Sequence, residues 1–202
     1  GVAVPSMAMS GFFAQSFLTR DNYQDLLKDC FQTMKLFGSK VAFLPLGGSG
    51  KDWQQEGCAA YQQMVSRLRT AGEMAKQEGI TIGIRTGMGA KFDKKLLKKV
   101  GSSQIKVYYN FQDAADHHRD ICKELRKLGA QRIVQIHVSN TDSVNLQEDP
   151  EINLPKIRKT LDKMKWSGWL VVERSRDVKR VRDVKYNFGR NIAYLKQVFQ
   201  ER

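Results

Sequence analysis

The feature that most constrains the fold is a unit of amphipathic helix, glycine and short apolar strand that recurs five times along the chain. In each unit, apolar residues at helical spacing lead to a glycine, which suits the left-handed backbone that often closes a helix. A run of β-branched and aromatic residues then indicates a strand. The five glycines and the strands that follow them are Gly38 with residues 41–44, Gly79 with 80–84, Gly101 with 105–109, Gly129 with 133–138 and Gly168 with 169–172.

These strands lack the alternation of apolar and polar residues that marks a sheet with one wet face. Near-continuous runs of Val, Ile and aromatic residues favour parallel strands that are covered by helices. A first strand over residues 2–9 and a last helix over 188–199 complete the pattern. We predict an α/β fold of the TIM-barrel type with roughly six parallel strands, although an open, doubly wound sheet also fits this count. No linker divides the 202 residues, so a single domain over residues 1–202 is expected.

The chain is strongly basic, with 34 Lys and Arg against 21 Asp and Glu and a formal net charge of +13. Such a charge favours anionic partners, namely phosphorylated small molecules, nucleic acid or acidic surfaces. Alternatively, the cations solvate the outer faces of helices, because residues 91–99 and 156–165 interleave cations with apolar residues at helical spacing. The charge alone does not decide between these interpretations.

No apolar stretch is long enough to cross a bilayer, so no membrane partner is expected. No signal peptide is visible, which favours a cytoplasmic location, while a secreted or periplasmic one stays open if a signal has been removed. The three cysteines, Cys30, Cys58 and Cys122, form no CxxC pair. They therefore suggest neither a zinc knuckle nor a disulfide framework, and Cys30 and Cys122 fall on apolar helix stripes.

Four predicted strands turn polar at their C-terminal ends, at Arg85, Asn110, His137 and Glu173. Alternate residues of a strand share a face, which points Arg85, His137 and Glu173 inward. Together the four converge at the mouth of a parallel barrel, where such folds place their active sites. Structural roles are the alternative: an ion pair of Arg85 with Glu173, strand-end hydrogen bonds from Asn110, and a satisfied core histidine at His137.

Other motifs are weaker. Residues 47–51 (GGSGK) look like a phosphate loop but are followed by Asp52 rather than Ser or Thr, and Asp52 is more simply a helix N-cap. A contact between this loop and a substrate phosphate stays open. His117 and His118, beside Asp113 and Asp116, are placed where a helix begins. Adjacent histidines on a helix point in different directions, so they make a poor metal pair.

Four segments resemble the sugar phosphate isomerase/epimerase family, of the xylose isomerase-like TIM-barrel superfamily to which endonuclease IV also belongs. They are 80–86 (ITIGIRT), 105–110 (IKVYYN), 133–140 (IVQIHVSN) and 168–177 (GWLVVERSRD). The resemblance implies that the chain begins at the third barrel strand, with the first two βα units absent. Six strands do not close a barrel of eight. The chain is then a fragment of a longer protein, or a homo-oligomer covers the open edge.

The family resemblance implies one divalent metal (Mn, Zn, Co or Mg), held by Glu, Asp, His and Glu at the ends of the last four strands. His137 and Glu173 match two of these positions, whereas Arg85 and Asn110 replace the first Glu and the Asp. A guanidinium repels a divalent cation, and one carboxylate with one imidazole is too few for a tight site. No metal is therefore expected. Asn140 and Arg176, near the last strand ends, are predicted to bind substrate.

By this resemblance, the chain is expected to be a sugar or sugar-phosphate isomerase or epimerase that moves a proton next to a carbonyl. Glu173 is the candidate base, His137 the candidate acid or hydrogen-bond donor, and Arg85 the cation that stabilises an enediolate or holds a phosphate. A non-catalytic carbohydrate-binding or structural relative is the alternative. An endonuclease IV-like enzyme, and with it a nucleic-acid partner, is disfavoured because three histidines are too few for clustered zinc ions.

Overall fold

The computed structural model describes residues 1–47 and 52–201. It separates into two compact units, Gly1–Tyr108 and Tyr109–Arg202. We describe each unit by itself. The residues 48–51 of the glycine-rich loop lie outside the described part of the chain, so the phosphate contact predicted for that loop is not tested.

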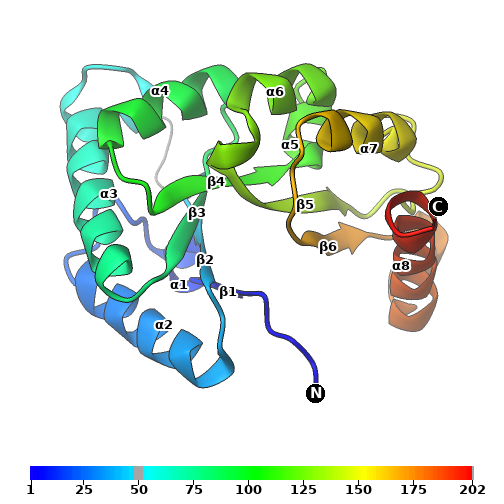
Figure 1. Cartoon of the computed structure of the whole chain (residues 1–202), viewed down its shortest axis with the longest axis horizontal. Helices are drawn as coiled ribbons and strands as arrows, with labels where there is room; N and C mark the ends of the chain where they lie inside the picture. The colour runs from blue at the N-terminus through cyan, green and yellow to red at the C-terminus, as the bar shows by residue number, and fades with distance from the viewer. Residues whose placement is uncertain (48–51, 202) are drawn as a thin grey trace. The chain divides into compact units, whose positions relative to one another are not determined.

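The first unit consists of parallel strands that alternate with helices (Figure 1). Strands β1 (Ser6–Ala8), β2 (Val41–Pro45), β3 (Thr81–Arg85) and β4 (Ile105–Asn110, which runs into the second unit) pair in chain order, each parallel to the next. The helices of this unit are α1 (Gly11–Ala14), α2 (Tyr23–Phe37), the 3-10 helix η2 (Asp52–Gln54), α3 (Ala59–Gln77) and α4 (Ala90–Val100). A doubly wound sheet reverses its strand order, so the chain order seen here favours the barrel type.

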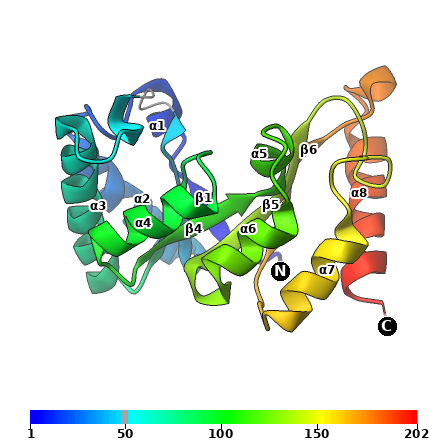
Figure 2. The same ribbon diagram turned by 90° about the horizontal axis from the view of Figure 1, so that it is seen from above.

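The second unit continues the same alternation. Its elements are α5 (Phe111–Ala115), α6 (Ile121–Leu128), η3 (Ala130–Arg132), β5 (Ile133–Thr141), α7 (Leu154–Lys163), β6 (Leu170–Ser175), η4 (Val178–Arg180) and α8 (Val184–Phe199). Strands β5 and β6 are parallel, and α6 lies beside α7 (Figure 2). The predicted α/β fold of the TIM-barrel type, with about six parallel strands, is confirmed.

Apolar stripes of the helices pack inward, as their spacing predicted. In α3, for example, Tyr61, Met64, Leu68 and Ala75 are buried, and in α6 Ile121, Cys122, Leu125 and Leu128 are buried. Burial of such side chains contributes about 1.5–3 kcal/mol each for the larger ones. The three cysteines are free thiols, and burial raises the pKa of the Cys30 thiol to about 11. No helix in the described ranges is both long and apolar enough to cross a membrane.

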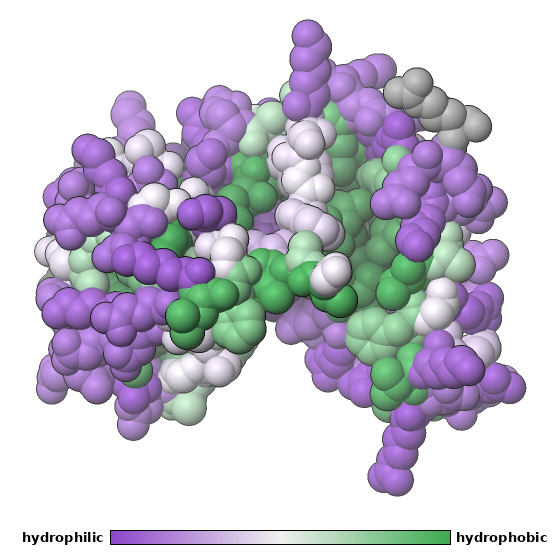
Figure 3. Space-filling model, turned by 60° about the horizontal axis from the view of Figure 1, so that its bottom comes forward, coloured by the Kyte–Doolittle hydropathy of each residue, from purple (hydrophilic) through white to green (hydrophobic). Residues whose placement is uncertain are grey.

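Charged residues do solvate the outer faces of helices. Lys91, Lys94, Lys95, Lys98 and Lys99 of α4 are all exposed. In Figure 3, hydrophilic residues occupy much of the surface on the face shown, and hydrophobic residues gather in separate areas between them. Part of the basic charge of the chain therefore belongs to the solvated outer faces of helices.

Three local predictions were wrong. Strand β1 begins at Ser6, not at residue 2, and Pro5 immediately before it lacks the N–H that a paired strand needs. Asp52 starts the 3-10 helix η2, whereas α3 is capped by Cys58, whose sulfur accepts the Tyr61 N–H at 3.3 Å. His117 and His118 lie in the turn between α5 and α6, and His118 has a positive φ of 51°.

The end of α7 also differs from the prediction. The left-handed residue is Lys165, with φ 53°, rather than Gly168. Gly168 matters for another reason, because a Cβ added there would meet the ring of Trp166 at 2.6 Å. The Trp166 Nε1 donates to the carbonyl of Ile133 at 3.0 Å, at the start of β5. Gly168 thus leaves room for the indole that joins the α7–β6 turn to β5.

Candidate functional site

His137, the middle residue of β5, and Glu173, two residues before the end of β6, lie against each other. Their Nδ1 and Oε2 atoms are 3.4 Å apart, and the side chains are 9% and 31% exposed. The register pairs His137 with Val171, and Val171 and Glu173 lie two residues apart on one face of β6. The contact shows that the two side chains lie on the same face of the paired strands, and their predicted inward placement stays a prediction.

The strand register is irregular at this point. Shifts occur between His137 and Ser139 and again between Ser139 and Asn140, so that Val172 lies opposite Ser139 and Arg174 opposite Asn140. Bulges of this kind re-aim side chains and are frequent beside active sites. The result is a buried imidazole against a carboxylate that solvent or a ligand can reach, an arrangement suited to moving a proton.

Asn110, at the end of β4, has one engaged and one unsatisfied group. Its Oδ1 accepts the N–H groups of Gln112 at 2.8 Å and Asp113 at 3.4 Å and so caps α5. This confirms the structural role considered for its oxygen. Its Nδ2 is buried and has no hydrogen-bond partner among the described residues, and the same holds for the Ser139 Oγ. A buried unpaired donor costs about 1–3 kcal/mol, so both atoms are suited to receive a polar ligand or water.

Asn140 and Arg176, predicted to bind substrate, belong to a network of side chains at the ends of β5 and β6. Asp142 lies between Arg176 Nε at 2.5 Å and Arg174 Nη1 at 3.0 Å. Arg174 Nε also donates to Asn140 Oδ1 at 2.9 Å. The hydrogen bond from Arg176, together with the charges of both guanidiniums, lowers the pKa of Asp142 below its usual value. Substrate contact by Asn140 and Arg176 stays a prediction.

Arg85 lies in the first unit, at the end of β3. It is half-buried, pairs in register with Pro45, and its carbonyl accepts the Leu46 N–H at 2.9 Å. Asn110, His137 and Glu173 lie in the second unit. The cavity predicted to be shared by Arg85 with His137 and Glu173, and the ion pair of Arg85 with Glu173, therefore stay predictions.

Sequence reasoning missed Asp142 and Arg174. Neither stands at a predicted strand end, because β5 runs to Thr141 and β6 to Ser175, beyond the apolar runs that marked both strands. An acidic residue followed at a distance by an Arg-x-Arg segment gives no local signal that the three side chains meet. The pairing depends on the strand register, which the bulges shift.

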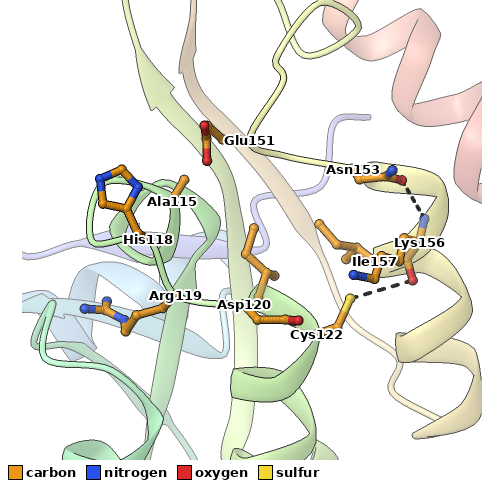
Figure 4. Close-up of a pocket in the computed structure, with 10 residues that line it drawn as sticks. Ala115, His118, Arg119, Asp120, Cys122, Glu151, Asn153, Lys156 and Ile157 are labelled. Carbon is orange, nitrogen blue, oxygen red and sulfur yellow. Dashed lines mark hydrogen bonds between the residues drawn. The ribbon is translucent and has the colours of Figure 1, made fainter.

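A cavity of about 350 Å³ lies between the α5–α6 turn and the start of α7. Figure 4 shows side chains of both charges around it. Arg119 contacts Glu124 at 3.5 Å, while Asp120 caps α6 by accepting the Lys123 N–H at 2.9 Å. That backbone hydrogen bond, helped by the charge of Lys156, lowers the pKa of Asp120. Most of the charges here thus serve the helix ends.

A divalent metal does not fit the residues at the strand ends. Where His137 and Glu173 meet, the donors are one imidazole and one carboxylate; the Asp142 carboxylate is paired with Arg174 and Arg176, and the amide oxygen of Asn110 accepts two backbone N–H groups. Across the described ranges, no group of three or more His, Cys, Asp or Glu side chains could hold a metal ion. Hard divalent cations take six or more oxygen ligands, and zinc takes about four ligands in all.

Comparison with known proteins supplies the family context. The model of a family described as "Xylose isomerase-like TIM barrel" matches residues 1–198, and no curated protein sequence matches the chain. An AP endonuclease of family 2 from Brucella melitensis has 14% identity and a TM-score of 0.75, over 98% of this chain and 80% of that one. A 3-keto-D-glucoside 4-epimerase from E. coli has 11% identity and a TM-score of 0.76, with the same coverage.

A sugar phosphate isomerase/epimerase from Parabacteroides distasonis is similar in structure too, with 16% identity and a TM-score of 0.73 over 97% of this chain and 71% of that one. Identities this low show a shared fold and leave the chemistry of this chain to be argued from its own residues. The family resemblance inferred from the four strand segments is confirmed.

Proposed function

Because the chain belongs to the xylose isomerase-like TIM-barrel family, we propose that it is a sugar or sugar-phosphate isomerase or epimerase that transfers a proton next to a carbonyl. The observation that carries the proposal is the contact between His137 and Glu173, 3.4 Å apart, with the carboxylate accessible in the C-terminal half of β6. Active sites of barrel enzymes lie at this end of the strands.

In the proposed reaction Glu173 acts as the base. Its carboxylate takes the proton from the carbon beside the substrate carbonyl, and the electrons of the broken C–H bond form the double bond of an enediolate. The carbonyl oxygen gains negative charge, which a hydrogen bond from the imidazole of His137 stabilises. In an isomerase, Glu173 returns the proton to the former carbonyl carbon, while the hydroxyl proton of the neighbouring carbon passes through His137 to the oxyanion. In an epimerase, the proton returns to the same carbon on its opposite face, with His137 as the acid.

Two buried donors, one from β4 and one from β5, would hold the substrate. Asn110 Nδ2 and Ser139 Oγ have no hydrogen-bond partner among the described residues, and sugar hydroxyls accept hydrogen bonds from such groups. No step of the scheme passes through a metal ion, in keeping with the small donor set. Three separate variants test the roles predicted for the other candidate residues: Arg85→Gln, Asn140→Ala and Arg176→Gln.

Proton exchange with solvent tests the proposal directly. The protein is incubated in D₂O with pentoses, hexoses and their phosphates, and deuterium at the carbon next to the carbonyl is followed by NMR. We expect exchange with at least one sugar, and a loss of about 10²–10⁴-fold in its rate for Glu173→Gln. Glu73→Gln is the matched control, because Glu73 is an exposed acid on α3; its exchange rate should equal that of the wild type.

The alternative of a non-catalytic carbohydrate-binding relative predicts a different result. A sugar would then bind, by calorimetry, without any deuterium incorporation in the wild-type protein. Exchange that persists at the full rate in Glu173→Gln would instead show that the base is another residue.

A further inference from the structure

A groove of about 350 Å³ runs between helices α6 and α7, which lie side by side in Figure 2. We name it the α6–α7 groove. Its walls carry four cations, and its other lining residues are one hydroxyl and one thioether. They are Arg126 of α6, then Lys156, Lys159, Thr160 and Lys163 of α7, and Met164 just beyond it.

Among the described residues, the acids within α6 and α7 pair with other cations, and of the groove cations Lys156 alone acts on the nearby N-cap acid Asp120. The acid of α6, Glu124, contacts Arg119 at 3.5 Å, and the acid of α7, Asp162, contacts Arg158 at 2.6 Å. Within the described part of the chain, no ion pair includes Arg126, Lys156, Lys159 or Lys163. Like charges one helical turn apart, such as Lys159 and Lys163, repel each other. An anion seated between the helices would relieve that repulsion.

The spacing of the lysines suits a row of phosphates. Lys156, Lys159 and Lys163 stand at positions i, i+3 and i+7 of α7 and therefore share one face. At about 1.5 Å per residue they span about 10 Å along the helix axis. One strand of a nucleic-acid duplex carries a phosphate about every 3.4 Å along its axis while it turns around that axis, so more than one phosphate of a strand is within reach of this row.

The lining of the groove also indicates which polyanion fits. A membrane-binding helix needs an exposed apolar face beside its cations, but the apolar residues of α6 and α7 are buried. Single-strand binders stack bases on aromatic rings, and no aromatic residue lines the groove. Met164 and the alkyl stems of the cations supply the apolar part of the lining, and charged heads at its rim would contact the backbone of a duplex without reading base sequence.

We propose that the α6–α7 groove binds the phosphate backbone of a double-stranded nucleic acid, without sequence preference. This site is separate from the His137–Glu173 pair and does not rest on the sugar chemistry proposed above. The scarcity of histidines disfavoured a zinc nuclease. It does not bear on backbone binding, which needs cations alone.

Fluorescence anisotropy with a labelled 16-base-pair duplex tests the proposal on the full chain, between 50 and 200 mM NaCl. We expect Lys159→Glu/Lys163→Glu to weaken binding at least about tenfold and to reduce the salt slope by about two units. Lys94→Glu/Lys98→Glu on α4 is the matched control, because both lysines are exposed and have the same spacing and charge change. That control should weaken binding less than about threefold.

Further measurements show whether the effect comes from the charge of the groove. They control for the identity of the side chains, for the base sequence of the duplex and for misfolding of the variants. Lys159→Arg/Lys163→Arg should bind as the wild type does, and duplexes of unrelated sequence should bind equally. Thermal unfolding should show that the groove variants fold, since exposed substitutions change stability by about 0.5 kcal/mol or less. Should the Glu variant not fold, Lys159→Gln/Lys163→Gln takes its place, with a slope reduced by the same two units.

Three results would overturn the proposal. One is equal weakening in the groove and control variants, which would show attraction to net charge alone. The second is an absence of duplex binding by the wild-type protein at 50 mM NaCl. The third is binding to vesicles of anionic lipid that the groove substitutions abolish while duplex binding persists.

Discussion

The strand ends of β5 and β6 and the α6–α7 groove lie in the same unit and are both rich in charge, but they handle it differently. At the strand ends the basic side chains contact acids: Arg174 and Arg176 pair with Asp142, and the imidazole of His137 lies against Glu173. In the groove, Arg126, Lys159 and Lys163 face no acid in the described part of the chain. The ion pairs at the strand ends hold the side chains of that site in place, whereas the cations of the groove are suited to bind an anion from solution.

The largest effect on activity is expected for the pair proposed to be catalytic, His137 and Glu173. His137→Gln should lower the deuterium exchange rate by about 10²-fold, because the hydrogen bond to the developing oxyanion is weakened. Combined with Glu173→Gln it should add little further loss, since residues that act as one unit are not additive. His117→Gln is the control, because His117 is an exposed histidine. Fully additive losses would mean that the two residues act independently.

The strand ends should also be the more stability-sensitive region. Asn187 is fully buried and makes hydrogen bonds with Asn145, Asp177, Arg180 and Asp183. Asn187→Ala leaves these groups unpaired and should cost about 3 kcal/mol, or about 6–12 °C in Tm for a chain of this length. Gln197→Ala, at an exposed position of α8, should change the Tm little. If the Tm of Asn187→Ala were close to that of the wild type, the region around the strand ends would be no more sensitive to substitution than the groove.

The smallest effect concerns the pH dependence of Asp142. Its pKa lies below the ordinary value because Arg176 donates a hydrogen bond to it and because both guanidiniums are near. The lowered pKa of the folded state means that the pairing stabilises the protein above the ordinary pKa, and that this is lost as pH falls through the lowered value. Carboxyl NMR should give a low midpoint that Arg176→Gln raises and that Arg182→Gln, at an exposed position, leaves unchanged. A wild-type midpoint at or above the ordinary value would contradict this.

Much of the fold could be predicted from the sequence because its signals are local. Apolar spacing located the buried stripes of α3 and α6, and Gly38 and Gly101 do close their helices in left-handed conformation. Strand parity could place His137 and Glu173 on one face, but their contact also depends on the register between β5 and β6. The exact end of α7 could not, since Lys165 takes the backbone conformation that the pattern assigned to Gly168.

The remaining site features depend on contacts between distant residues. The shift of register beside Ser139 brings Arg174 opposite Asn140, and no run of apolar residues encodes where a bulge falls. The network around Asn187 joins residues from the β5–α7 loop, the end of β6 and α8. Each of these residues, seen alone, is an ordinary polar residue of a loop or a helix.

Lys156 lines both the α6–α7 groove and the cavity beside the α5–α6 turn. One ammonium group serves two neighbouring spaces, so an anion bound in one reduces the positive field available in the other. An anion placed in the cavity would then compete with one in the groove, each lowering the affinity of the other by the same factor. Removing that single charge, as in Lys156→Gln, would weaken anion binding in the groove and remove this coupling.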